Sequence, residues 1–309
     1  MQRRIHALFL YLLLMFLEIA FPQKGEDLLP QPGECGTLNK AYMYNQKNIT
    51  ELDEFPWMGR IAHRMNESDD TRFLCAAVLI SKYHLLTNAN CFRYEEQAYA
   101  VLLGDWNMTN NVSEPDCEFS DKGPSRCAPI PVLYEIAEII VNLNYTPKIK
   151  ADNIALLRLA EPVVYSSYIR PICLPSLRAT QLNLVSFHLT LTGWSSKIRD
   201  EPRKSKKFVH VVCQKTCAKW NKVRKTRYKQ IFHKNNSLLC ASSCSPENKW
   251  KYTGGSALMG VTTLGTVPYY YYLIGLIAYG RLNCSKIYPD LFVRINEGHL
   301  DWVKENLYL

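Results

Sequence analysis

Residues 75–80 read CAAVLI, and residues 86–91 read LTNANC. The first run is short and apolar and is followed by the polar residues Ser81 and Lys82, which is typical of the end of a buried β-strand. Similar short runs recur along the chain, at residues 98–103, 136–141, 189–191, 273–278 and 291–295. Gly, Pro and Asn separate the runs, so the pattern predicts an all-β sandwich or barrel.

Two stretches have the composition of helices. Residues 218–228 are basic and lack Gly and Pro, and residues 300–307 place Leu300, Val303 and Leu307 on one face.

The start of the chain and its cysteines indicate a secreted, extracellular protein. Arg3 and Arg4 precede an uncharged apolar run at residues 7–17, and polar residues follow Ala20, which predicts a signal peptide at residues 1–20. The run is too short for a membrane span unless Glu18 is also buried, so a signal peptide is preferred over an anchor. The 11 cysteines point to a disulfide framework with one cysteine left over.

Sequons for N-glycosylation support the same compartment. The expected sites are Asn48, Asn66, Asn107, Asn111, Asn144 and Asn235. A further sequon at Asn283 is disfavoured because Cys284 lies inside it.

Nine segments, in order, resemble the chymotrypsin/trypsin-like serine proteases, in the form common in arthropod extracellular cascades. The segments are PWM at 56–58, CAAVLI at 75–80, LTNANC at 86–91, DNIALL at 152–157, RPICLP at 170–175, TGW at 192–194, LCA at 239–241, GG at 254–255 and YG at 279–280. The resemblance implies two six-stranded antiparallel β-barrels, a cleft between them and a C-terminal helix. We expect one such domain at residues 44–309, preceded by a segment at 21–43 that is tethered through Cys35.

The resemblance also implies a set of disulfides. The expected pairs are Cys75–Cys91, Cys35–Cys173, Cys117–Cys127 and Cys217–Cys240. Cys284 matches a family cysteine whose usual partner position is Lys249 here, so Cys244 is its nearest candidate. Cys213 is then unpaired, and it is either buried and inert or bonded to another chain. We prefer the buried state, because a free cysteine usually behaves as a small apolar residue.

The family cuts peptide bonds with a Ser nucleophile, a His base and an Asp that orients the His. The resemblance places Asn90 at the His position, Thr253 at the Ser position and Asp152 at the Asp position. An amide cannot take a proton near neutral pH, and Thr253 is left without a base. We expect Asp152 to be a buried carboxylate whose hydrogen bonds could include the amide of Asn90. His84 is expected to be a barrel residue rather than a replacement base.

The family's activation switch is also altered. Tyr252 stands where the Asp that pairs with the new amino terminus is expected, and residues 41–47 contain no motif like IVGG. Lys251 replaces the glycine that leaves room for the oxyanion hole. Glu247, near the specificity position, does not indicate a trypsin-like pocket. We therefore expect an inactive serine protease homologue, and no spacing typical of a metal or cofactor site stands out.

The positive charge is concentrated in residues 197–234, which contain fourteen Lys and Arg residues and only two acids, Asp200 and Glu201. This segment carries a net +12, whereas the rest of the chain carries −3, which gives the overall charge of +9. Such density attracts acidic proteins or sulfated glycans, although a solvated face without a partner is the alternative. The expected patch comprises Lys204, Lys206, Lys207, Lys219, Lys222, Arg224, Lys225, Arg227 and Lys229.

The leading hypothesis is a secreted, non-catalytic homologue that binds an extracellular protease or zymogen. It would act as a cofactor, decoy or regulator of a proteolytic cascade such as those of arthropod immunity. The alternative is a protein that binds glycans or acidic surfaces through residues 197–234. A third hypothesis is a residual endopeptidase using Thr253. We expect no nucleic-acid partner and no membrane span.

Overall fold

The computed structural model describes residues 28–45, 47–65, 68–92, 96–120, 123–147, 151–213, 215–217, 237–242, 251–279 and 289–309. Within these ranges the chain is mostly β-strand and ends in a helix. None of the helices found there is long and apolar enough to cross a membrane. The expected signal peptide, and the stretch at 218–228 expected to be helical, lie outside the described residues.

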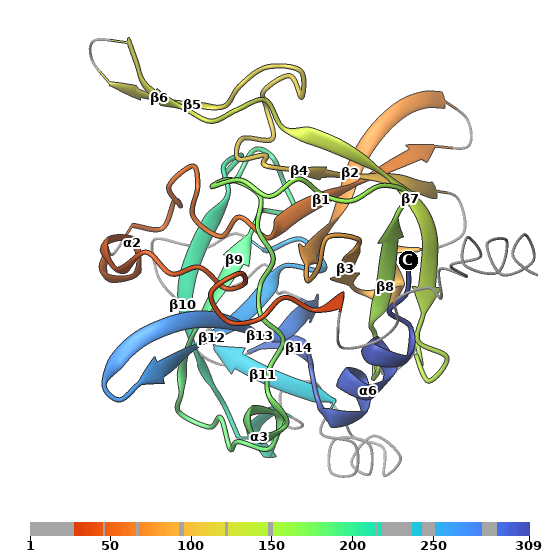
Figure 1. The fold of residues 1–309 in the computed structure, drawn as a ribbon, viewed down its shortest axis with the longest axis vertical. Helices are drawn as coiled ribbons and strands as arrows, with labels where there is room; N and C mark the ends of the chain where they lie inside the picture. Colours follow the sequence, from red (N-terminus) through yellow and green to blue (C-terminus); the bar gives the residue numbers. More distant parts are fainter. Residues whose placement is uncertain are drawn as a thin grey trace, which may run out of the picture.

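The first barrel is closed by six antiparallel strands in the order β1-β2-β3-β8-β7-β4 (Figure 1). They are β1 (Met58–Met65), β2 (Ser68–Leu79), β3 (His84–Thr87), β4 (Glu96–Leu103), β7 (Val132–Val141) and β8 (Ala155–Leu159). The apolar run at 75–80 forms the end of β2, between β1 and β3. Its residues Ala77, Val78, Leu79 and Ile80 are fully buried in the core, which explains why the run has no polar positions.

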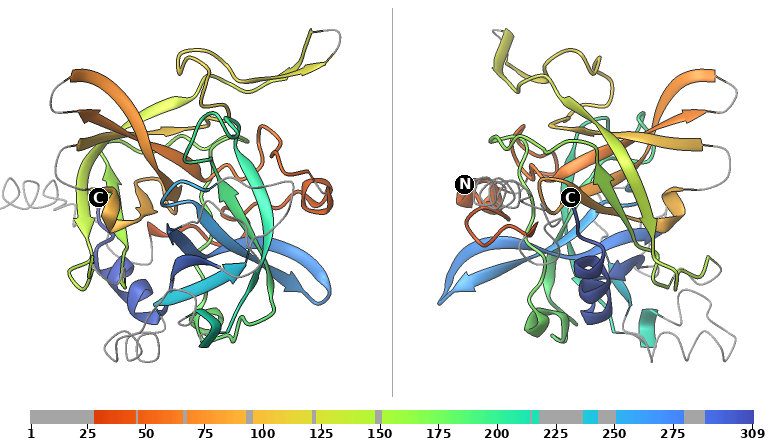
Figure 2. Two further views of the ribbon diagram at one scale, coloured as in Figure 1. Left: turned by 180° about the vertical axis from the view of Figure 1, so that it is seen from behind. Right: turned by 45° about the vertical axis from the view of Figure 1, so that its right-hand side comes forward.

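The second barrel is also closed, in the order β10-β11-β14-β13-β12-β9. Its strands are β9 (His188–Gly193), β10 (Ser205–Val211), β11 (Leu238–Ser242), β12 (Ala257–Leu264), β13 (Val267–Tyr279) and β14 (Asp290–Arg294). The predicted pair of six-stranded antiparallel barrels is therefore confirmed. A hairpin of β5 (Cys117–Ser120) and β6 (Gly123–Cys127) projects away from the barrels in both views of Figure 2.

A continuous apolar core holds the two barrels together. Trp57 of the first barrel and Met259 of the second belong to the same buried cluster, and the Trp57 indole Nε1 lies 3.2 Å from the Met259 sulfur. Because the barrels share this core, residues on the strands and loops at their junction are held in fixed relative positions.

The remaining elements are short except for the last. They are α2 (Lys40–Tyr44), η2 (Ala89–Cys91), α3 (Leu177–Thr180) and α6 (Glu297–Glu305). Asn296 caps the start of helix α6, and its side chain accepts a hydrogen bond from the backbone N–H of His299. Leu300 and Val303 of α6 are buried in the core, as is Leu307, which follows the end of the helix. The predicted C-terminal helix is therefore confirmed, although it ends at Glu305 and does not reach Leu307.

Among the described residues there are four disulfides, and all of them are among the expected pairs. They are Cys35–Cys173, Cys75–Cys91, Cys117–Cys127 and Cys217–Cys240. Cys244 and Cys284 lie outside the described residues. The preference for a buried Cys213 is wrong: this free cysteine is exposed, because it lies beyond the end of β10, where the chain leaves the barrel.

The sequon asparagines differ in exposure. Asn111 and Asn144 are exposed, whereas Asn48 and Asn107 are half-buried. Asn66 and Asn235 lie outside the described residues. Glycosylation remains a prediction, and Asn111 and Asn144 are the positions best placed for it.

Candidate functional site

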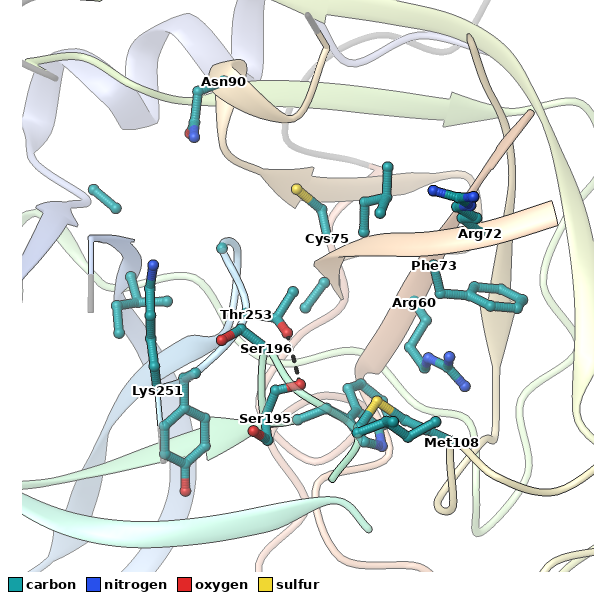
Figure 3. A pocket seen from close by; sticks show the side chains of 18 residues that line it. Arg60, Arg72, Phe73, Cys75, Asn90, Met108, Ser195, Ser196, Lys251 and Thr253 are labelled. Carbon is teal, nitrogen blue, oxygen red and sulfur yellow. Dashed lines mark hydrogen bonds between the residues drawn. The ribbon is translucent and has the colours of Figure 1, made fainter. Parts of the chain in front are cut away.

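A cavity of about 620 Å³ opens where the two barrels meet (Figure 3). Its lining joins β1 and β2 of the first barrel to the segments 194–198 and 251–254 of the second. Asn90 and Thr253, two of the positions singled out in the sequence, both line it. Asp152, assigned there as the third member, is not among the described lining residues.

The side chain that pairs with Asn90 is Asn153. The backbone N–H of Asn90 donates to the Asn153 Oδ1 at 2.9 Å, and the Asn153 Nδ2 donates to the Asn90 Oδ1 at 2.7 Å. Asn153 is fully buried and lies two residues before β8, and Asn90 is the middle residue of the short η2 turn. The two amides thus form a closed pair, and neither can serve as a proton acceptor near neutral pH.

The assignment of Asp152 is corrected by this geometry. Asp152 has a φ of +50°, and its carboxylate lies 3.0 Å from the Nε2 of His299 on α6. The Nδ1 of His299 lies 2.9 Å from the carbonyl of Arg294. The backbone turn at Asp152 directs its side chain to the C-terminal helix, so the next residue, Asn153, takes the place beside Asn90. The sequence alone did not reveal Asn153, because it is adjacent to Asp152. An assignment that is displaced by one residue selects the neighbouring side chain, which points elsewhere.

Both hydrogen-bonding groups of Thr253 are used within the protein. Its Oγ1 donates to the carbonyl of Ser195 at 3.2 Å, and its backbone N–H donates to the carbonyl of Trp194 at 2.9 Å. In the family mechanism the N–H of the nucleophile is one of the oxyanion-hole donors. Here that donor is already bonded to a carbonyl of the same chain.

The loop that carries Thr253 is held along segment 194–196. Ser195 and Tyr252 form a β-bridge, and the N–H of Ser196 donates to the carbonyl of Lys251 at 2.7 Å. Gly255 packs the end of the loop against β2, because a Cβ at this position would lie 2.0 Å from the carbonyl oxygen of Ala76. These contacts fix the loop, with Lys251 half-buried at the cavity wall.

Tyr252 occupies the expected place of the activation aspartate. The residue is 1% exposed, and the Oγ of Ser205 donates to its hydroxyl at 3.1 Å. The new amino terminus was expected near residues 41–47, and the chain continues from there into a short pairing at the start of β10. Ile49 forms a β-bridge with Ser205, and the backbone N–H of Thr50 donates to the carbonyl of Lys204 at 3.1 Å. The residue at the expected aspartate position therefore forms a hydrogen bond between two hydroxyl groups.

His84 is a barrel residue, as predicted. It is fully buried on β3, and its Nδ1 lies 3.0 Å from the Oγ of Ser81. Burial, aided by the nearby positive charge of Arg158, lowers the pKa of His84 to about 4. The ring is not among the described residues that line the cavity, so it is not placed to act on a ligand there.

Three members of the expected basic patch are buried, so their assignment to a surface patch is wrong. Lys204, Lys206 and Lys207 are only 2%, 2% and 6% exposed. The Lys206 Nζ lies 2.6 Å from a carboxylate oxygen of Glu54, the Lys207 Nζ lies 4.0 Å from Asp290, and burial lowers the pKa of Lys204 to about 8. The other members lie outside the described residues: Lys219, Lys222, Arg224, Lys225, Arg227 and Lys229.

Arg60 is held at the opposite wall of the cavity. Its Nη1 donates to the Oδ2 of Asp105 at 2.6 Å, and its guanidinium carbon lies 4.1 Å from the centre of the Phe73 ring. Burial, the largest influence, raises the pKa of Asp105, although Arg60 opposes the shift. Across the ranges that the structure describes, no group of three His, Cys, Asp or Glu side chains is placed to hold a metal ion.

Comparison with known proteins settles the family. The sequence profile described as Trypsin matches residues 46–303. The chain belongs to the trypsin family. It is 26% identical to Serine protease ea of Drosophila melanogaster over 92% of this chain and 72% of that protein. It is 28% identical to Phenoloxidase-activating factor 3 of Holotrichia diomphalia over 92% of this chain and 78% of that protein.

A solved structure agrees on the fold. The crystal structure of the Drosophila Grass clip serine protease of the Toll pathway superposes on this trypsin-family chain with a TM-score of 0.69. The two chains share 23% sequence identity, and the match covers 88% of this chain and 73% of the chain in that crystal structure. The trypsin-family chain thus has the arrangement of barrels expected from its sequence motifs.

Proposed function

We propose that this chain is a non-catalytic member of the trypsin family that acts by binding. The observation that carries the proposal is the pairing of Asn90 with Asn153 through two hydrogen bonds of 2.9 and 2.7 Å. A hydrolytic mechanism of the family type requires a base that removes a proton from the nucleophile. Two paired amides offer no such base, and Thr253 directs its hydroxyl to the carbonyl of Ser195 instead.

The hydrogen bonds of the loop at residues 251–254 support the same proposal. The N–H of Thr253 is bonded to Trp194, and Tyr252 replaces the charged group of the activation switch. Loss of one oxyanion donor alone costs about 100- to 1000-fold in rate. The absence of a base adds to this loss, although the effects of residues in one catalytic unit do not simply sum.

The names of the relatives support the proposed class of partner. Several carry names of proteins that process or activate others, such as Spaetzle-processing enzyme of Drosophila melanogaster and Phenoloxidase-activating factor 3. We therefore place this chain in an extracellular proteolytic cascade, where it binds a protease or zymogen as a cofactor, decoy or regulator. Four disulfides support secretion, because such bonds persist in oxidising compartments.

The test begins with reactivity. The purified mature protein is incubated with a fluorophosphonate probe and with a broad peptide library, beside a Thr253→Ala variant. The proposal expects no labelling of Thr253 and identical, background product formation by both proteins. Labelling at Thr253, or cleavage that disappears in Thr253→Ala, would establish an endopeptidase instead.

The binding role is measured in the extracellular fluid of the source organism. Added mature protein is expected to change the rate at which the fluid's own proteases cleave a chromogenic substrate, and Thr253→Ala is expected to do so equally. A heat-unfolded sample serves as the control. An effect that requires Thr253 would contradict a purely binding role.

A further inference from the structure

The hairpin of β12 and β13 differs from the rest of the chain because its sequence is uncharged. Residues 252–280 contain no Asp, Glu, Lys, Arg or His, although 21% of the chain is Asp, Glu, Lys or Arg. The outer part of the hairpin, residues 260–270, extends beyond the second barrel in Figure 1 and in both views of Figure 2. In the described part of the chain, residues 260–264 and 267–270 pair only with each other. This outer part therefore has no neighbouring strand to cover it.

The tip of the hairpin is apolar. Leu264 and Val267 pair across the two-residue turn of Gly265 and Thr266, and they are 72% and 48% exposed. Gly265 has a φ of +62°, which suits such a turn, and a Cβ placed there would meet none of the described residues within 4 Å. The tip thus presents two adjacent apolar side chains to open space.

Four consecutive tyrosines connect the tip to the barrel. Tyr271 and Tyr272 are buried, one in each of the two large apolar cores, so they anchor the base of the hairpin. Tyr269 is 49% exposed and Tyr270 is half-buried, and their rings meet edge to face with centroids 5.2 Å apart. A pair of amphipathic rings therefore lies between the buried base and the apolar tip.

This order of side chains suits the surface of a lipid bilayer. Apolar side chains are stable in the hydrocarbon, whereas tyrosine rings prefer the layer of head groups, where the hydroxyl stays hydrated. A charged side chain would oppose insertion, and the hairpin has none. The two strands also pair as far as Leu264 and Val267, which limits the number of unpaired backbone groups that would enter the bilayer. A projecting, uncharged tip lacks the charges by which protein partners recognise each other.

The other projecting hairpin, β5–β6, lacks this combination. Phe119 is 75% exposed there, but residues 117–127 also include Glu118, Asp121, Lys122 and Arg126. Insertion of that hairpin would bury charge, so Phe119 offers a matched control for an exposed apolar side chain on a hairpin.

We propose that the outer part of the β12–β13 hairpin is a membrane-docking site, in which Leu264 and Val267 enter the hydrocarbon of a lipid bilayer and Tyr269 and Tyr270 lie among the head groups. The site uses neither the cavity at the barrel junction nor the basic segment at 197–234. It goes beyond the proposed function, because it places the protein on a lipid surface whatever its protein partner is. Docking by so small an apolar area is reversible.

The probe is a vesicle of pure phosphatidylcholine, which carries no net charge. The whole protein is mixed with vesicles at high ionic strength, where basic residues contribute little attraction, and the bound fraction is measured by flotation. We expect the parent protein to bind. Leu264→Ser should lower the partition coefficient by about tenfold or more, and Leu264→Ser with Val267→Ser should abolish binding. Phe119→Ser should leave binding unchanged, and thermal unfolding shows that each variant is folded.

A second measurement locates the inserted residue. Tryptophan at position 264, introduced as Leu264→Trp, should gain fluorescence that is quenched by phosphatidylcholine brominated on its acyl chains. The fluorescence gained in Phe119→Trp should not be quenched.

Four results would overturn the inference. The first is no binding to neutral vesicles, and the second is binding only to anionic vesicles, which would assign the attraction to basic residues. The third is an equal loss of binding in Leu264→Ser and Phe119→Ser. The fourth is self-association without lipid that Leu264→Ser abolishes, measured by analytical ultracentrifugation, which would assign the tip to a second copy of the chain.

Discussion

The side-chain amide of Asn153 donates to the Oδ1 of Asn90 at 2.7 Å, and the backbone N–H of Asn90 donates back to the Oδ1 of Asn153 at 2.9 Å. Asn153 is fully buried, so its donor and acceptor are both removed from water and both are satisfied by one neighbour. The pair ties the η2 turn to the segment that leads into β8.

The first prediction concerns the coupling of these two amides. Asn153→Ala should lower the free energy of unfolding by about 1–3 kcal/mol, because it leaves the N–H and Oδ1 of Asn90 without their partner. The free energies of unfolding of the parent, Asn153→Ala, Asn90→Ala and the double variant, measured by chemical denaturation, form a double-mutant cycle. We expect an interaction energy of about 0.5–3 kcal/mol, and strictly additive losses would argue against the pair.

A second prediction concerns the buried ion pair of Lys206 and Glu54, whose atoms lie 2.6 Å apart. Both side chains are almost fully buried, so removing one leaves an uncompensated charge in the interior. Glu54→Leu or Lys206→Met alone should destabilise the protein by about 3–5 kcal/mol, whereas the double variant should recover most of that loss.

The measurement is denaturation of the three variants beside the parent protein. A single variant as stable as the parent would show that the pair is exposed to solvent. The side chain of Lys206 is covered, and it also donates to the carbonyl of Tyr42 at 2.8 Å. Folded Lys206→Met protein and folded parent protein should therefore be retained equally on heparin.

The third prediction is a pH dependence that comes from His84. Burial lowers its pKa from 6.5 to about 4, so between these values the unfolded chain binds the proton and the folded protein does not. Stability should therefore fall as the pH drops from 6.5 towards 4, and the His84 contribution to the loss should reach about 3 kcal/mol. Above pH 6.5 both states are neutral and the contribution vanishes.

Unfolding of the parent and of His84→Gln is compared across this pH range. Carboxylates contribute equally to both proteins, so their difference isolates the histidine. The variant should lose less stability than the parent on acidification, and identical slopes would mean that His84 keeps its ordinary pKa in the fold.

The fold was predictable because its signals are local. In runs such as residues 75–80 and 300–307, the positions of the apolar residues in the sequence predict which side chains are buried. The order of the motifs along the chain predicts the two barrels. The exchange of Asp152 and Asn153 was not predictable in this way, because it depends on a backbone turn of φ +50° and on His299, far along the chain. Lys206 was misplaced for a similar reason: its partner Glu54 lies 152 residues away, and a count of charges does not report burial.

The last prediction is that restoring the three catalytic residue types does not restore catalysis. The triple variant Asn90→His, Asn153→Asp and Thr253→Ser regains the nucleophile, the base and the orienting acid. However, the N–H at position 253 still donates to Trp194, Lys251 still replaces the glycine of the oxyanion hole, and Tyr252 still supplies no charge for the activation switch. With the N–H at position 253 engaged elsewhere, the variant should remain at least about 100-fold slower than an active family member on the same peptide ester. Active-site titration with a fluorophosphonate measures the fraction of the triple variant that reacts.

A stoichiometric burst from the triple variant would contradict the prediction. It would show that the loop opens easily, and that the identities of residues 90, 153 and 253 alone account for the lack of activity.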